Sequence, residues 1–381
     1  MKKRHGFRFV LLCGLLAGIL FSGNAVSQAE ISLETVSEQM EITRTKELPA
    51  TPTARKTTKQ LTQGTILVPG GEAVGIKLYT KGVMVVGFSE LNTSGIKNPA
   101  LKAGVRKGDV ILAVNGTEVN SNEELAAQTE QAGEQPVELS VRRKGNTLTI
   151  KVTPVRDSVT GTLRLGLMVR DSTAGIGTLT YYDPTDGSFG SLGHGIGDAD
   201  TGEILPLGRG TLEPVSITSV RKGKAGDPGE LKGYFRIGST LGGLTANLEE
   251  GLFGIGNGLE ITGREAVHAA SRKEIHTGPA TIRCTVDEEG IKEYSIEIVR
   301  IYSAQTKTKN MLIRVTDPVL LEKTGGIVQG LSGSPILQNG KLIGAVTHVL
   351  VDDPTKGYAI FVENMLETAQ SVAEEKLKEA S

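Results

Sequence analysis

The sequence has no tryptophan, and aromatic residues make up only 4% of its 381 residues. Lysine and arginine number 42 against 43 acidic residues, so the chain carries no basic excess. A nucleic-acid surface needs a basic face with aromatic side chains among it, so we expect no nucleic-acid partner. Two cysteines and five histidines without i, i+4 ligand spacing predict no metal cluster, and we expect no cofactor.

Long hydrophobic runs are also scarce. Basic residues open the chain, and an uncharged, mostly apolar run follows from Phe9 to Phe21. This run is shorter than the roughly 20 residues of a membrane span, although extension to Val26 makes a marginal one. The pattern predicts that residues 1–26 are a cleaved export signal or a retained membrane anchor, and that the remainder is exported. Cys13 lies in this run and Cys284 in a strand-like stretch, so we expect no disulfide between them.

Residues 27–62 are rich in Thr, Glu, Lys and Gln, with little apolar periodicity. This composition is typical of an exposed linker, and such a segment is easily cut by a protease.

Apolar patterning begins near residue 63. A capping box of Ser121 and Glu124 predicts a helix to about Ala132, and alternation from Val137 to Val152 around a Lys-Gly-Asn turn predicts a hairpin. Residues 63–155, and above all the series Pro-Ala-Leu-Lys-Ala-Gly-Val-Arg-Lys-Gly-Asp-Val-Ile-Leu-Ala-Val-Asn-Gly at 99–116, resemble a PDZ domain. The resemblance implies that a peptide tail adds a strand to a sheet edge, with its carboxylate bound by a loop at Gly75, Ile76, Lys77 and Leu78.

Residues 156–381 contain many short apolar runs separated by Gly, Asp and Lys turns, with one clear helix from Glu363 to Lys378. This pattern predicts a β-barrel or sandwich closed by the helix.

The stretch Gly330-Leu331-Ser332-Gly333-Ser334-Pro335 presents a serine on a tight turn. Glycine supplies the dihedral angles that let the N–H groups of Gly330 and Ser332 converge on a carbonyl oxygen, which makes Ser332 a candidate nucleophile beside an oxyanion hole. Ser334 is the second choice of nucleophile. An ordinary glycine-rich turn has the same composition and stays an alternative.

His194 lies between two glycines, so its ring is open to act as a general base. Such a pair needs a carboxylate to orient the imidazole. Asp317, after a strand-like run and before Pro318, is the first candidate, and Asp198 is the second. For His348 core packing is the preferred interpretation over a place in the cleft.

Together with the N-terminal segment and the PDZ-like region, these motifs resemble the stage IV sporulation protein B peptidases. The resemblance implies a mainly β chain, with an α/β PDZ domain before a chymotrypsin-like β-barrel peptidase domain, and it places the catalytic His, Asp and Ser on His194, Asp317 and Ser332. It further implies export across the forespore membrane, membrane attachment through the N-terminal segment, self-cleavage of the linker in trans, and cleavage of a membrane-anchored inhibitor of an intramembrane metalloprotease, so that pro-sigma-K processing is triggered. The alternative is a non-catalytic PDZ-containing envelope scaffold, which would tolerate loss of Ser332 or His194.

Overall fold

The computed structural model describes residues 62–379, apart from 63, 94, 237, 258, 260–262 and 303–305. By its contacts the chain divides into two units, Met1–Arg55 and Lys56–Ser381, and only the second contains described residues. The predicted signal or anchor and almost all of the predicted linker therefore lie outside the described residues. Among the helices of the described part, none is both long and apolar enough to cross a bilayer.

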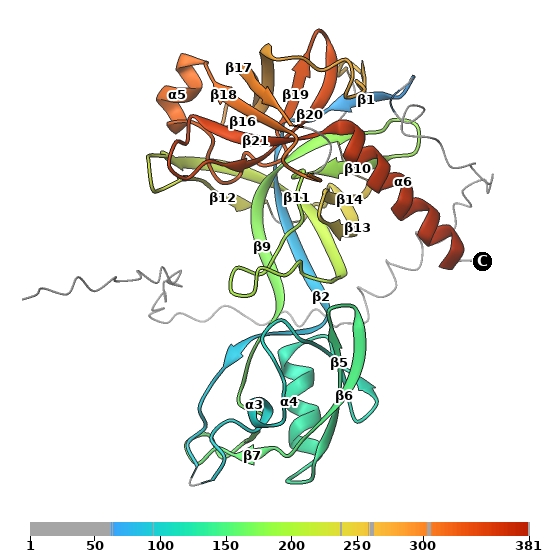
Figure 1. Cartoon of the computed structure of the whole chain (residues 1–381), viewed down its shortest axis with the longest axis vertical. Helices are drawn as coiled ribbons and strands as arrows, with labels where there is room; N and C mark the ends of the chain where they lie inside the picture. The colour runs from blue at the N-terminus through green and yellow to red at the C-terminus, as the bar shows by residue number, and fades with distance from the viewer. Residues whose placement is uncertain are drawn as a thin grey trace, which may run out of the picture. The chain divides into compact units, whose positions relative to one another are not determined.

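Strands dominate the described chain (Figure 1), which confirms the prediction of a mainly β fold. The first half contains β1 (Ile66–Pro69), β2 (Ala73–Phe88), α3 (Pro99–Lys102), β3 (Val110–Val114), β4 (Thr117–Glu118), α4 (Asn122–Gln131), β5 (Val137–Arg143), β6 (Asn146–Val152), β7 (Val155–Arg156), β8 (Leu163–Arg164), β9 (Leu167–Tyr182) and β10 (Ser188–Ser191). The second half contains β11 (Leu207–Arg221), β12 (Glu230–Phe235), β13 (Gly242–Leu248), β14 (Gly251–Gly256), β15 (Val267–His268), β16 (Gly278–Thr285), β17 (Ile291–Ile301), β18 (Met311–Val315), α5 (Pro318–Thr324), β19 (Pro335–Gln338), β20 (Lys341–Val349), β21 (Lys356–Phe361) and α6 (Val362–Glu379).

The PDZ-like core is built from β3, β5, β6, α4 and parts of β2 and β9. The Ser121 hydroxyl accepts the Glu124 N–H at 3.1 Å, so α4 starts where the capping pattern predicts. β5 and β6 form the predicted hairpin, with Val137 opposite Val152. Their inward side chains are buried because alternation places every second residue on the core face.

A six-membered ring of strands follows from the pairings β2–β9, β9–β10, β10–β14, β14–β13, β13–β11 and β11–β2. We call this ring the first barrel. It encloses a core of seven buried apolar residues, Val74, Ile76, Leu179, Phe189, Leu192, Leu212 and Leu252.

β2 and β9 belong to both the PDZ-like core and the first barrel, and they run side by side (Figure 1). The residues up to Tyr79 pair with barrel strands, whereas Val83 and Val85 are buried in the PDZ-like core. On β9, Leu167 and Val169 also pack on that core. The predicted PDZ range of 63–155 therefore needs correction at both ends, because its first strand is largely a barrel strand and its last strand comes after residue 155.

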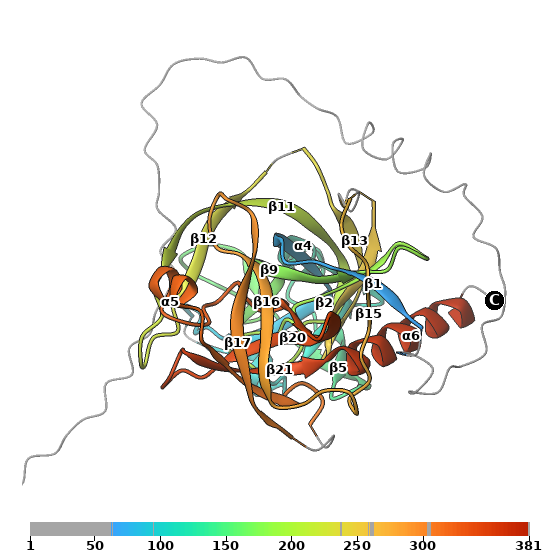
Figure 2. The same cartoon turned by 90° about the horizontal axis from the view of Figure 1, so that it is seen from above.

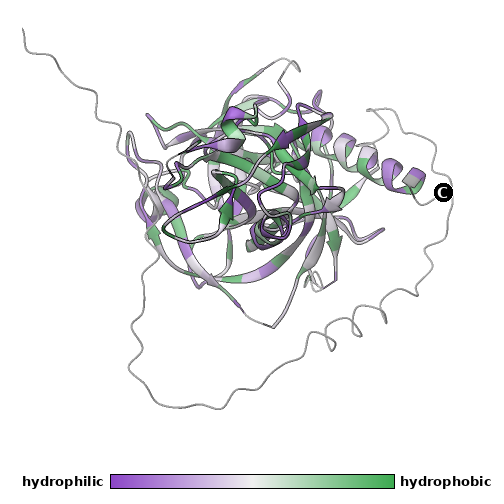
Figure 3. Cartoon of the chain, turned by 90° about the horizontal axis from the view of Figure 1, so that it is seen from below, coloured by the Kyte–Doolittle hydropathy of each residue, from purple (hydrophilic) through white to green (hydrophobic). Residues whose placement is uncertain are grey.

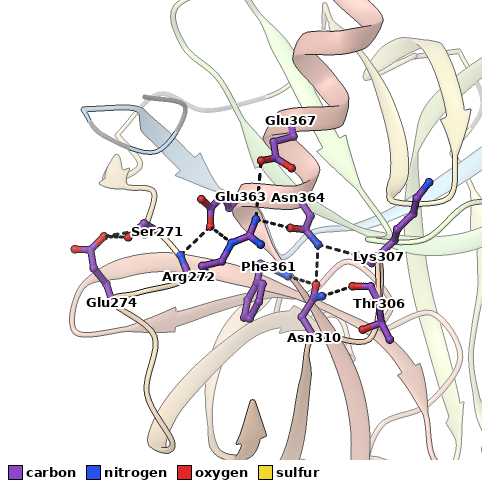
Figure 4. Close-up of polar contacts among 10 residues, drawn as sticks. All are labelled: Ser271, Arg272, Glu274, Thr306, Lys307, Asn310, Phe361, Glu363, Asn364 and Glu367. Atoms are coloured by element: carbon purple, nitrogen blue, oxygen red, sulfur yellow. Dashed lines mark hydrogen bonds and ion pairs between the residues drawn. The ribbon is translucent and has the colours of Figure 1, made fainter. Parts of the chain in front are cut away.

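β16, β17, β18, β21, β20 and β19 close a second barrel (Figure 2). The predicted C-terminal helix is confirmed as α6, which is mostly hydrophilic towards its end (Figure 3). Arg272 holds the start of α6 through an ion pair of 2.8 Å with the buried Glu363 and a hydrogen bond to Asn364 (Figure 4). Asn310 in turn binds Asn364 and the backbone of Phe361, so a polar network fixes the helix to the barrel.

Candidate active site

Ser332 lies on the turn that leads into β19 of the second barrel. Gly330 and Gly333 on either side have φ values of 102° and 97°, a region that favours glycine. A Cβ atom at Gly333 would lie 2.0 Å from the carbonyl oxygen of Thr178, so the position excludes any larger residue. The local sequence thus makes the turn, and β9 of the first barrel lies directly against it.

Thr178 of β9 holds this turn by two hydrogen bonds. Its N–H donates to the Ser332 carbonyl at 2.9 Å, and its hydroxyl donates to the Gly330 carbonyl at 2.8 Å. Thr180 donates in the same way to the Gly333 carbonyl at 2.8 Å. These contacts occupy the carbonyl groups, whereas no hydrogen bond within the described chain uses the N–H of Gly330 or of Ser332. Both predicted oxyanion donors are therefore free to bind a developing negative charge.

His194 follows β10 on a second tight turn, in which Gly193 has a φ of 66°. Thr178 also holds this turn, because its carbonyl accepts the Ser191 hydroxyl at 2.7 Å and the Leu192 N–H at 3.4 Å. One buried threonine thus touches the loops of both predicted catalytic residues.

The electrostatic setting of His194 favours a neutral ring. Burial lowers the pKa of the imidazole below its usual value, and the Gly195 carbonyl, 2.9 Å from Nδ1, partly opposes this shift. Because the Gly195 carbonyl can only accept a hydrogen bond, Nδ1 carries the ring proton and donates it to this carbonyl. Nε2 of the neutral ring then has no proton and can accept one. This is the form that a general base requires at neutral pH.

His348 is the described side chain whose ring faces His194, at 4.7 Å between ring centroids and 35° between planes. Desolvation, followed by the charges of His194 and Lys309, lowers the pKa of His348 to about 4. The structure corrects the core-packing interpretation, since His348 lines the same pocket as His194 and Ser332. In the sequence His348 only follows Thr347; the contact between the Thr347 carbonyl and Ser332, which brings this end of β20 to the pocket, is seen in the structure alone.

Asp317 has a different set of partners. Its carboxylate caps α5 by accepting the N–H groups of Val319 at 3.0 Å and Leu320 at 3.1 Å, and it also accepts the Ser295 N–H at 3.3 Å. No described contact joins it to His194. Asp317 as the orienting carboxylate therefore stays a prediction from its place in the sequence and from the family resemblance.

The two second choices also have other partners in the structure. The Asp198 carboxylate forms an ion pair of 2.5 Å with Arg170 and has no described contact with the His194 ring. Ser334 is fully buried, and its hydroxyl donates to the Leu331 carbonyl at 2.7 Å. This contact stabilises the turn and makes Ser334 unsuitable as a nucleophile.

Ser332, His194, Thr347 and His348 line one open pocket of about 500 Å³. The Ser332 hydroxyl donates to the Thr347 carbonyl at 2.7 Å rather than to His194. For proton transfer the hydroxyl must turn from Thr347 towards His194. In the structure the predicted nucleophile and the predicted base therefore line one pocket, with the hydroxyl of Ser332 bound to Thr347.

The predicted peptide-binding loop is wrong. Gly75 to Leu78 lie within β2, where Gly75 pairs with Ile176 on one side and Glu213 on the other. Both edges of the strand are occupied, so these four residues, Gly75, Ile76, Lys77 and Leu78, leave no edge for a peptide. In the described ranges there is also no group of three His, Cys, Asp or Glu side chains placed to hold a metal ion.

Comparisons with known proteins match two parts of the chain to family models. The family model SpoIVB peptidase S55 matches residues 161–366, and a PDZ domain model matches residues 81–153. Two curated relatives match shorter stretches. A probable periplasmic serine endoprotease, DegP-like, from Bartonella henselae is 34% identical over 106 residues, which is 26% of this chain and 21% of the relative. The zinc metalloprotease RasP from Shouchella clausii is 36% identical over 80 residues, which is 21% of this chain and 18% of the relative.

The chain thus spans about a fifth of the length of these relatives. Among solved structures, the PDZ domain of the SdrC-like protein from Listeria monocytogenes has 17% identity and a TM-score of 0.20, and covers 23% of this chain and 87% of its own. An inactive serine-to-alanine mutant of Rv3671c from Mycobacterium tuberculosis has 12% identity and a TM-score of 0.28, and covers 52% of this chain and 82% of its own. Scores this low do not establish a shared fold.

Proposed function

The chain belongs to the SpoIVB peptidase S55 family and is a serine peptidase with a PDZ domain, and from that premise we propose that it acts as a self-cleaving endopeptidase of sporulation signalling. In this proposal it cuts its own linker in trans and then a membrane-anchored inhibitor of an intramembrane metalloprotease, which starts pro-sigma-K processing. It works in the space between forespore and mother cell, attached at first by its N-terminal segment.

The observation that supports the chemistry best is the shared pocket of Ser332 and His194, in which the N–H groups of Gly330 and Ser332 have no partner among the described residues. A substrate carbonyl placed against these two donors lies within reach of the Ser332 hydroxyl. His194 takes the hydroxyl proton on Nε2 as the oxygen attacks, and later returns it to the leaving amine. Each oxyanion donor contributes about 3 kcal/mol in comparable enzymes.

Self-cleavage is tested with the full chain, unaltered and as Ser332→Ala and His194→Ala. We expect linker fragments in the unaltered chain alone, followed over time by mass spectrometry. Mixing the unaltered chain with Ser332→Ala should release fragments from the variant, because cutting occurs in trans. Identical fragments in all samples would instead support the scaffold alternative.

For the signalling step, sporulating cells that carry Ser332→Ala should accumulate uncut inhibitor and unprocessed pro-sigma-K, measured by immunoblot. Normal processing in these cells would contradict the proposed pathway while leaving the peptidase assignment intact.

We place the peptide edge of the PDZ domain on β9. Over Leu167–Arg170, β9 pairs with β2 on one side and with no described strand on the other. Met168 in this stretch is 52% exposed, as an apolar residue on an unpaired edge would be before a peptide covers it.

A fluorescent peptide of linker residues 41–62 is the probe for this edge. We expect it to bind the full-length Ser332→Ala chain in an anisotropy titration, and Met168→Asp to weaken binding by about tenfold or more, since an acidic side chain opposes a strand with a carboxylate end. Val159→Asp is the matched control, because Val159 is also exposed, at 75%, but lies outside the edge. Equal binding by both variants would exclude this edge.

A further inference from the structure

The loop that follows the general base packs on the PDZ-like core. We call residues 195–206 the histidine loop. Its buried Leu205 belongs to one apolar cluster with Leu78, Met84 and Val110. The Pro206 carbonyl accepts the Lys81 N–H at 2.9 Å, close to the same cluster. Strands of the PDZ-like core therefore support the segment that directly follows His194.

Asp198 organises the histidine loop from within. Its side chain is fully buried, and one carboxylate oxygen accepts the N–H groups of Asp200 at 3.0 Å and Thr201 at 2.8 Å. Its backbone N–H donates to the Glu203 carbonyl at 2.9 Å, and its carbonyl accepts the Gly202 N–H at 2.8 Å. The fold of the loop thus depends on a buried negative charge, which is costly unless a cation compensates it.

Arg170 supplies that cation. Its guanidinium lies 2.5 Å from Asp198 and 3.2 Å from Asp200, and no other described basic side chain pairs with either carboxylate. Arg170 comes from β9, opposite Met84 of β2 and next to Val169, which packs on the PDZ-like core. The ion pair therefore joins the PDZ half of β9 to a residue four positions after His194.

The connection reaches the imidazole through the backbone between these residues. Asn247, itself buried, binds both the N–H and the carbonyl of Ile196, at 2.8 and 2.9 Å. Gly195 donates its N–H to the Glu249 carbonyl at 3.2 Å, and its own carbonyl faces Nδ1 of His194. A shift of the histidine loop would move the Gly195 carbonyl away from Nδ1 of His194. The hydrogen bond that keeps the ring proton on Nδ1 would then be lost.

We propose that Arg170 is a positioning residue for His194. By neutralising Asp198 it holds the histidine loop, and therefore the Gly195 carbonyl, in the arrangement that leaves Nε2 of His194 free to accept a proton. The PDZ domain thus contributes a charged residue to the readiness of the peptidase site. The inference rests on the proposed function in so far as it treats His194 as the general base.

The test uses the full chain and a fluorophosphonate probe, in which the Ser332 oxygen displaces fluoride from phosphorus while its proton passes to His194. We expect Arg170→Gln to lower the labelling rate by about ten- to a hundredfold, the size of effect that small misplacements of catalytic groups have. Arg170→Lys should restore a large part of the rate because it keeps the charge. Arg170→Gln with Asp198→Asn should recover part of it, since the buried charge is then absent.

Arg156→Gln is the matched control, because Arg156 also pairs with two carboxylates, Glu130 and Glu134, but away from the histidine loop. It should be labelled at the unaltered rate. Equal losses for Arg156→Gln and Arg170→Gln, or no loss for Arg170→Gln, would overturn the proposal.

A second measurement does not depend on catalysis. In ¹⁵N spectra of histidine-labelled chains, Arg170→Gln should change the ring signals of His194, and Arg156→Gln should leave them in place. Unchanged His194 signals in Arg170→Gln would refute the positioning role even if the probe labels no form of the chain. Probe labelling that persists in Ser332→Ala would contradict the serine peptidase mechanism instead.

Discussion

Thr178 joins the two catalytic loops, so replacing it with valine is a direct test of how the site is held. Valine keeps the shape of the side chain and all backbone contacts, but it removes the hydroxyl that donates to the Gly330 carbonyl at 2.8 Å. That carbonyl is then left buried without its partner, which costs about 1–3 kcal/mol. For a domain of about 150–250 residues each kcal/mol lowers the Tm by about 2–4 °C.

Thr178→Val should lower the labelling rate strongly while the protein stays folded. Gly330 provides one of the two oxyanion donors, and complete loss of such a donor lowers kcat about 100- to 1000-fold. Thr178→Val keeps the Gly330 N–H but no longer fixes its position, so the effect should be smaller than complete loss of the donor. We expect the rate of fluorophosphonate labelling to fall by about tenfold or more.

Thr180→Val is a close control. Thr180 is also fully buried and makes the same hydroxyl-to-carbonyl bond, of 2.8 Å, but to Gly333, which follows the nucleophile and provides no oxyanion donor. Both variants should lose similar stability in thermal melts, whereas Thr178→Val should lose clearly more of its labelling rate. Equal labelling rates in the two variants would refute the assignment of Gly330 to the oxyanion hole.

Three further predictions concern pH, the nucleophile turn and α6. The pKa of His348 is about 4 in the folded chain and about 6.5 in the unfolded chain. Between these pH values the unfolded chain binds a proton that the folded chain does not, so protonation favours unfolding. The Tm should therefore fall as the pH drops from about 6.5 to 4, and it should fall less in His348→Asn. Gly333→Ala should abolish labelling and cost at least about 2 kcal/mol, whereas Gly340→Ala, with a positive φ but open space around it, should cost about 1 kcal/mol in urea unfolding. Arg272→Gln should lower the free energy of unfolding by about 1–3 kcal/mol because the buried Glu363 keeps the backbone N–H of residue 272 but loses its counter-charge, while labelling stays unchanged.

Local sequence patterns correctly predicted those elements whose stabilising contacts join residues close together in the sequence. The α4 cap and the β5–β6 hairpin depend on partners within about 16 positions along the chain, and periodicity and turn residues specify them. The turn of Ser332 is local in the same sense, since its glycines adopt the positive φ values that the motif requires.

Patterns did not reveal which distant strand a segment pairs with. β2 is one strand of 16 residues whose two halves serve different cores, and nothing in its alternation separates Gly75 to Leu78 from the PDZ part. Its barrel half is buried because β11 and β9 lie on its two sides, and those partners come about 100 to 140 residues later. This is why a barrel strand was predicted as a peptide-binding loop.

Asp317 was predicted to orient the histidine, although the Asp317-Pro318 pair also carries the signature of a helix start. Aspartate is a preferred N-cap and proline suits the first helical position, and α5 begins in this way. The cap uses the Asp317 carboxylate for the N–H groups of the helix. The Asp-Pro pair alone therefore signals a role that competes with orienting a histidine.

The strand β9 gives a physical reason for a peptidase and a PDZ domain to share one chain. Its first residues form the edge that pairs with no described strand on one side, Arg170 at the end of that edge pairs with Asp198 of the histidine loop, and Thr178 farther along holds the turns of Ser332 and His194. The β2–β9 ladder runs from Phe88 to Ala73, with irregularities between Tyr79 and Met84 and between Val85 and Gly87, so the edge and Thr178 belong to one pair of strands. We therefore predict that a peptide bound along this edge changes the rate of probe labelling through both Arg170 and Thr178.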